Sequence, residues 1–188
     1  MTATSAVPEQ SPLGNRVHPL GRISKNKPIQ PVPANTRYFE AGVLRLGFES
    51  RELDEDVIVA NYGHDPAALA AVRKQNNYDL PEDEGMSLHV FDAASSQEIL
   101  RFDMFDDGPH YHYLPRQGGY HIVVVYDVAA NGDMFAWAAR ALRERAGVLL
   151  ENAGWGDLVP DVDPELLDAA LTEVEGTLSS LTGPIAGR

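Results

Sequence analysis

The sequence predicts an α+β fold: an antiparallel β-meander packed with a C-terminal helical pair and preceded by an extended, proline-rich N-terminal arm. Three observations predict it. Six prolines and almost no periodic apolar pattern occur in the first 37 residues. Short apolar runs alternating with turn residues follow, and apolar residues at helical spacing come last. The predicted parts are a basic arm over 1–37, a mainly β region with one short helix over 38–128, and the helical pair over 129–188.

The arm differs from the rest of the chain in charge as well as in proline content. It holds five basic residues against Glu9 alone, a net charge of +4, whereas the remaining residues carry 10 basic and 27 acidic side chains. Because proline fixes φ and removes a backbone donor, we expect neither a helix nor a central strand here. An extended basic segment is suited to docking on an acidic groove of a larger protein subunit. The expected partner-binding residues are Arg16, Arg22, Lys25, Lys27 and Arg37.

The β region begins with alternating apolar residues, Leu44, Leu46 and Phe48, which are typical of a half-buried strand. Residues 56–63 form a further apolar run. Asp65 followed by Pro66 then predicts the start of a short helix that continues to about residue 76. Four strand-like segments separated by turns of hairpin length predict the antiparallel meander. These segments are residues 87–92, 98–105, 110–114 and 120–127.

Two helices are expected after the meander. Asn131 or Gly132 can cap the first, Asp133 suits its positive end, and Gly154 lies just beyond its C-terminus. Its buried stripe is formed by Phe135, Ala138, Leu142, Ala146 and Leu149.

The second helix is expected from residues 163–164 to about residue 181. Its apolar residues step by four, three, four and three positions, which is a heptad pattern. Packing of this stripe on the sheet is one interpretation, and self-association or pairing with another subunit is the other. The stripe consists of Leu167, Leu171, Val174, Leu178 and Leu181.

Three of the six histidines lie within residues 107–121. Alternation along a strand places His110 and His112 on one face, and pairing with the next strand would bring His121 near His112. With Asp103 they form a candidate site for a divalent metal such as Zn, Fe or Mn. Asp106 and Asp107 could supply a further oxygen or orient a ring. A hydrogen-bonding role, or a solvated face shared with Arg101, is the alternative.

Composition excludes several classes of function. The chain has no cysteine, which excludes disulfides, thiolate catalysis and cysteine zinc sites. The acidic body disfavours nucleic acid binding. No phosphate loop, dinucleotide fingerprint or serine elbow occurs. No apolar run is long enough for a transmembrane segment, and the N-terminus lacks the apolar core of a secretory signal. We therefore expect a cytoplasmic protein, at most peripheral to the membrane through a partner.

The motif FDMFDDGPHYHY, followed by GDMFAWA, resembles a family of small bacterial proteins of uncharacterised function. That family shares an F-D-x-F-x-x-x-P-H-Y-H-Y core and a G-D-x-x-x-W-A helix. The resemblance covers about residues 86–182 and implies no activity for any residue. In a looser way, the chain is similar to small accessory subunits of bacterial uptake hydrogenases.

Three functions are compatible with these observations. The first is a non-catalytic accessory or scaffolding subunit of a larger bacterial enzyme complex, for which a redox enzyme such as an uptake hydrogenase is one candidate. It would dock by its arm and form a homo-oligomer through its C-terminal helices. The second is a small metal-binding protein or metalloenzyme that uses the histidine strand. The third is a small-ligand binding module lined by Tyr111, Tyr113 and Trp137.

Overall fold

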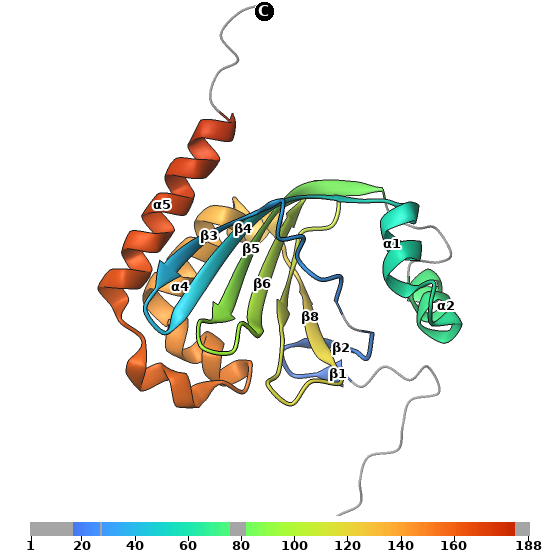
Figure 1. Ribbon diagram of the computed structural model, residues 1–188, viewed down its shortest axis with the longest axis horizontal. Helices are drawn as coiled ribbons and strands as arrows, with labels where there is room; N and C mark the ends of the chain where they lie inside the picture. The colour runs from blue at the N-terminus through green and yellow to red at the C-terminus, as the bar shows by residue number, and fades with distance from the viewer. Residues whose placement is uncertain (1–16, 27, 76–81, 183–188) are drawn as a thin grey trace, which may run out of the picture.

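Eight antiparallel strands form one sheet in the computed structural model, which describes residues 17–26, 28–75 and 82–182 (Figure 1). Their order across the sheet is β1-β2-β8-β7-β6-β5-β4-β3. The predicted α+β class is confirmed. The strands are β1 (Val17–His18), β2 (Gly21–Ser24), β3 (Thr36–Ala41), β4 (Leu44–Leu53), β5 (Asp83–Asp92), β6 (Glu98–Phe105), β7 (His110–Tyr113) and β8 (His121–Val125).

The strands β5 to β8 pair in chain order, so the predicted meander is confirmed. The register places Asp103 of β6 opposite His110 of β7, and His112 of β7 opposite Val123 of β8. His121 is therefore a diagonal neighbour of His112 on the same face of the sheet. The sheet thus brings together residues from three consecutive strands.

The expectation that no central strand forms within residues 1–37 is wrong, because β2 lies between two other strands of the sheet. β2 pairs with β8 on one side and with the two-residue β1 on the other. The reason is local: Pro19 lies in the turn before β2 and Pro28 lies after it, so β2 itself is free of proline and keeps all its backbone donors. Residues 1–16 lie outside the described residues.

Two helices connect β4 to β5, where one was expected. The apolar run at 56–63 belongs to α1 (Glu55–Tyr62), which begins where the Asp54 side chain accepts a hydrogen bond from the Val57 N–H. The predicted helix after Asp65 is confirmed as α2 (Pro66–Gln75). Figure 1 shows both helices at the end of the sheet opposite α5.

The C-terminal part contains α3 (Val128–Asn131), α4 (Met134–Asn152), the 3-10 helix η1 (Gly156–Asp161) and α5 (Pro164–Thr182). Asp133 caps α4, because its side chain accepts a hydrogen bond from the Ala136 N–H. The predicted caps are wrong: Asn131 ends α3, and Gly132 follows it as a connector. None of the described helices has the length and apolar character needed to cross a membrane.

The core lies between one face of the sheet and the helices α4 and α5. The predicted stripe of α4 is buried there, with Ala146 only partly buried. Leu167, Leu171 and Val174 of α5 are buried in the same core, whereas Leu181 is 63% exposed. The stripe of α5 therefore packs mostly on its own sheet, and its first three members cannot face a second copy in this fold. Leu178 is partly buried beside them.

Candidate functional site

The second face of the sheet is polar, although much of it is buried. Strand alternation gives this face the odd-numbered residues of β4, β5 and β6 and the even-numbered histidines of β7. Eight of its polar residues have at most 6% of their surface exposed. Because buried charges need partners, this face must be organised as a network. The eight are Ser24, Glu49, Ser87, His89, Arg101, Asp103, His112 and His121.

A cleft of about 470 Å³ opens on this face. Its polar wall comes from β2, β6, β7 and β8, and its apolar wall from α1, α2 and the segment around Ile29. The volume is within the range of small-molecule sites, and the mixture of apolar surface with a few convergent polar groups is typical of them. The polar lining includes Arg22, Asn26, Asp103, His110, His112 and His121.

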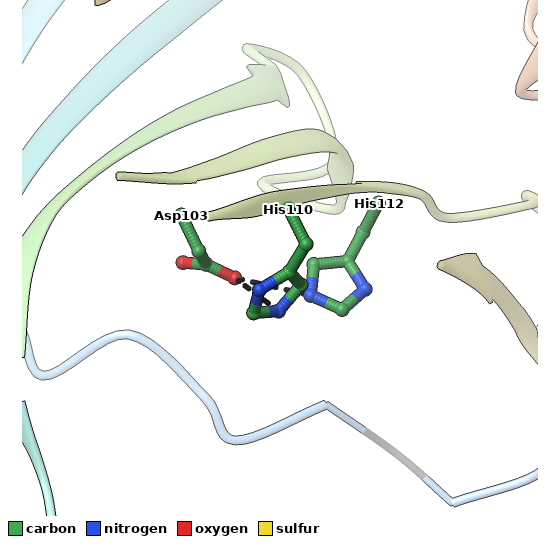
Figure 2. A group of neighbouring side chains, drawn as sticks. All are labelled: Asp103, His110 and His112. Atoms are coloured by element: carbon green, nitrogen blue, oxygen red, sulfur yellow. Dashed lines mark hydrogen bonds and ion pairs between the residues drawn. The ribbon is translucent and has the colours of Figure 1, made fainter. Parts of the chain in front are cut away.

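Asp103, His110 and His112 all line this cleft, and their side chains converge (Figure 2). The His112 Nε2 lies 3.0 Å from the Asp103 Oδ2, and the His110 Nε2 lies 3.5 Å from the same oxygen. The three candidate ligand atoms are all within 4.8 Å of one another. The other carboxylate oxygen of Asp103 accepts a hydrogen bond from the Ser87 hydroxyl at 2.5 Å, which fixes the carboxylate plane.

The turn between β6 and β7 orients the ring of His110. The Asp83 carboxylate accepts hydrogen bonds from the N–H groups of Asp107 and Gly108, at 3.2 and 3.0 Å. The Gly108 carbonyl in turn lies 2.6 Å from the His110 Nδ1. Because a carbonyl can only accept, Nδ1 donates to it, and this contact turns the Nε2 of the ring toward Asp103. This arrangement is the one found behind metal-ligating histidines.

Burial controls ionisation in the cleft. It lowers the pKa of His112 to about 4, although the hydrogen bond to Asp103 acts in the opposite direction. It also lowers the pKa of His121 to about 3, assisted by the neighbouring His112 and by Arg101 and Arg22. Burial opposes ionisation of Asp103, but the hydrogen bond from His112 and the charge of Arg101 hold its pKa well below the usual range. An ionised carboxylate beside the uncharged imidazole of His112 is a suitable pair of donors for a divalent cation.

The structure therefore brings together three of the four predicted metal ligands. His121 lies outside the triad: its ring centroid is 4.9 Å from that of His112, and its Nδ1 has no hydrogen-bond partner among the described residues. Asp106 and Asp107 are exposed in the turn, and neither belongs to the triad. Strand alternation predicted that these side chains lie near one another. The register between β6, β7 and β8 determines which three of them converge.

A second polar group, which the sequence analysis missed, lies beside the triad. His89 is held between two carboxylates, with its Nδ1 2.6 Å from the Glu98 Oε1 and its Nε2 2.9 Å from the Glu49 Oε2. Arg101 donates to both oxygens of Glu98, at 2.7 and 2.5 Å. Although burial alone would lower it, the pKa of His89 is raised by these two carboxylates. Arg101 and His89 lower the pKa of Glu98 to about 2 against the effect of burial.

Glu49 and Arg101 of this group hold the segment around Ile29 and Val32 against the polar face by hydrogen bonds. The Glu49 Oε1 accepts a hydrogen bond from the Val32 N–H at 2.7 Å, and Arg101 donates to the Ile29 carbonyl at 2.8 Å. Figure 1 shows the segment crossing in front of the central strands. Two backbone polar groups of residues 28–35 are thus paired with the network, and Pro28 and Ile29 of this stretch line the cleft.

The residues predicted for the third function lie on the opposite face. They are Tyr111, Tyr113 and Trp137, which pack in the core between the sheet and α4. The ring centroid of Trp137 lies 5.2 Å from that of Tyr111 and 5.1 Å from that of Tyr126. They line no part of the cleft. The prediction that they form a ligand pocket is therefore wrong, because strand alternation turns them toward the helices.

Of the predicted partner-binding residues, Arg22, Lys25 and Arg37 are exposed in the described chain. Arg22 also lines the cleft, and the guanidinium of Arg37 lies 5.1 Å from the ring centroid of Phe39. Arg16 and Lys27 lie outside the described residues. Docking of these residues on a larger subunit stays a prediction.

A family model described as a domain of unknown function, DUF7700, matches residues 38–178. No curated protein and no solved structure is significantly similar to the chain. The match contains the whole triad and both halves of the expected motif, FDMFDDGPHYHY and GDMFAWA, and it extends further toward the N-terminus than the resemblance did. The chain belongs to this family.

Proposed function

We propose that this protein binds a divalent transition metal ion through Asp103, His110 and His112, and that the cleft brings a small molecule to the ion. One observation supports this above all. Two histidine Nε2 atoms, from a single strand, approach the same carboxylate oxygen of the neighbouring strand at 3.0 and 3.5 Å. In the metal-free chain a ring proton can lie between nitrogen and oxygen, and a metal ion would replace that proton.

The spacing of the donors fits a metal ion. Bonds of about 2.1 Å in a tetrahedral site separate the ligand atoms by roughly 3.4 Å. The two distances to the Asp103 Oδ2 lie near this value, and the whole triad lies within 4.8 Å, so small rotations of the two rings would complete the geometry. Two imidazole nitrogens and one carboxylate oxygen suit Zn²⁺, Fe²⁺ or Mn²⁺.

The surroundings of the triad support a reactive site more than a closed structural one. Three protein ligands leave a coordination position for water or a substrate oxygen. That position would face the cleft, which the three ligand residues line. A bound ion would supply polarisation of a substrate oxygen or activation of water. The chain's own part is to hold the ring of His110 through the Gly108 carbonyl and the carboxylate of Asp103 through Ser87.

The experiment is metal titration of the full chain after treatment with a chelator. Calorimetry with Zn²⁺ and with Mn²⁺ is expected to give one ion per chain, and Co²⁺ should give the visible spectrum of a site with nitrogen and oxygen ligands. His110→Ala and His112→Ala should each weaken binding by more than about 100-fold, because loss of a direct ligand exceeds the effect of losing its support.

His64→Ala is the matched control, since His64 is exposed and lies outside the cleft. Circular dichroism of each variant separates loss of a ligand from loss of the fold. Wild-type affinity in both triad variants, or binding that His64→Ala removes, would disprove the proposal.

A further inference from the structure

Four buried side-chain polar atoms have no hydrogen-bond partner in the described part of the chain. Three of them, the Asn26 Nδ2, the His112 Nδ1 and the His121 Nδ1, belong to residues that line the same cleft. The fourth, the Arg45 Nε, belongs to a residue outside it. Since buried polar groups are nearly always paired, their gathering in one cleft indicates a polar ligand there.

The charge of this wall indicates the sign of the ligand. Arg22 lines the cleft and makes no ion pair with a described residue. Arg51 and Arg101 also line it, but both are paired. Arg51 lies 3.8 and 3.7 Å from the carboxylates of Glu49 and Asp103. Arg101 donates to Glu98 and to the Ile29 carbonyl. Arg22 is therefore a cation available to a ligand, and the amide of Asn26 adds an unused donor.

Strand pairing places these groups together. In the register of β2 with β8, Arg22 lies opposite Val123 and Ser24 lies opposite His121. Residues two apart on a strand share a face, so Arg22 and Ser24 point to the same side, and Asn26 follows at the end of the strand. All of them line the cleft. The donors thus flank His121 along one wall.

We propose that this wall, formed by Arg22, Asn26 and His121, binds the carboxylate of a small organic acid. A planar carboxylate matches the forked donors of a guanidinium and can accept a further bond from an amide. The inference rests on the proposed function in one respect: the bound acid would be presented to the metal ion. The binding wall itself needs no metal, although the His121 ring lies only 4.9 Å from that of His112.

The rest of the cleft defines the body of the acid. The apolar lining includes Ile29, Ile58 and Phe105, together with Val123 and Tyr126 at the β8 end. These side chains surround the space beyond the polar wall, so an apolar group would be accommodated there better than a second charge. The ligand class is therefore a monocarboxylic acid with an aliphatic or aromatic body.

The test compares phenylacetate with phenylacetamide, which has the same shape and no charge, and adds hexanoate and acetate. Binding to the metal-free full chain is measured by calorimetry. Phenylacetate or hexanoate should bind at least about tenfold more tightly than the amide or acetate, because the amide lacks the charge and acetate lacks the body. Arg22→Gln and Asn26→Leu should each weaken phenylacetate binding by about tenfold.

Arg145→Gln is the matched control, an exposed arginine on α4 away from the cleft, and it should leave binding unchanged. Equal affinity for acid and amide, no binding of any of the acids, or full affinity in Arg22→Gln would overturn the inference. Metal titration of the same samples separates the two proposals. If the chain binds a metal ion but no acid, only this inference fails. If it binds the acid through Arg22 but no metal ion, only the proposed metal function fails.

Discussion

Replacing His89 with glutamine tests the buried network that supports the cleft. His89 is fully buried, and its two ring nitrogens contact Glu98 and Glu49 at 2.6 and 2.9 Å. An imidazole that donates to two carboxylates is an imidazolium. Glutamine keeps an amide that can donate to one carboxylate, but it removes the positive charge between the two.

The magnitude follows from what each carboxylate retains. Removing one partner of a buried ion pair typically destabilises a protein by about 3–5 kcal/mol. Here Glu98 keeps Arg101, Glu49 keeps the Val32 N–H, and the glutamine amide restores one hydrogen bond of about 1 kcal/mol. We therefore expect His89→Gln to lower the free energy of unfolding by about 2–4 kcal/mol near pH 6.

The pH dependence has a defined sign. The raised pKa of His89 stabilises the folded state fully below the unfolded pKa of 6.5, and this contribution is lost as the pH rises through the folded pKa. The lowered pKa of Glu98 contributes stability above its ordinary value of 4.5, and this is lost as the pH falls toward about 2. The difference between wild type and variant should therefore be largest between about pH 4.5 and 6.5 and should shrink in alkaline solution.

Urea unfolding at pH 5, 7 and 9, followed by tryptophan fluorescence, measures the difference. His64→Gln is the control and should stay within about 0.5 kcal/mol of wild type, because its side chain is exposed. A variant destabilised by less than about 1 kcal/mol at pH 5, or one whose deficit grows toward pH 9, would refute the assignment of His89 as a buried cation.

Three further predictions follow from the same structure. Zn²⁺ at 100 times its dissociation constant should stabilise wild type by about 2.7 kcal/mol in thermal unfolding and leave His112→Ala unchanged; equal stabilisation of both would contradict the site. Leu171→Ala should destabilise the chain by about 2–5 kcal/mol without changing its mass in light scattering, because Leu171 is fully buried in its own core; dissociation of an oligomer instead would mean that Leu171 takes part in self-association. Removal of residues 1–16, which include Arg16, tests the accessory-subunit hypothesis by co-purification from the native host, and an unchanged set of partners would count against docking through that segment.

Strand alternation explains why much of the site was predictable. The spacing of His110 and His112 puts both on one face in any strand, and the short loop to β8 limits where His121 can lie. Asp103 follows from the hairpin register between β6 and β7. Local pattern was sufficient because all four residues come from three consecutive strands.

The parts that were not predictable depend on contacts between distant segments. Glu49 and His89 are 40 residues apart and meet only because β4 and β5 pair. The prolines around β2 concealed it, because the composition of the N-terminal segment was taken as a whole. A strand needs only a short stretch free of proline, and the four residues of β2 provide one. The heptad of α5 was ambiguous because the same spacing serves a coiled coil and a helix that packs on its own sheet.

The polar face of the sheet also bears on why a cleft exists. A buried ion network contributes little net stability compared with apolar side chains of similar volume. Residues 28–35 could cover an apolar face without Glu49, His89, Glu98 and Arg101. The network instead holds the backbone at Ile29 and Val32 as a fixed wall of the cleft. The triad lines the same cleft, as do Asn26 and His121 with their unpaired polar atoms. Because unpaired buried donors destabilise a chain that does not use them, their position beside the triad is best explained by a ligand that pairs with them.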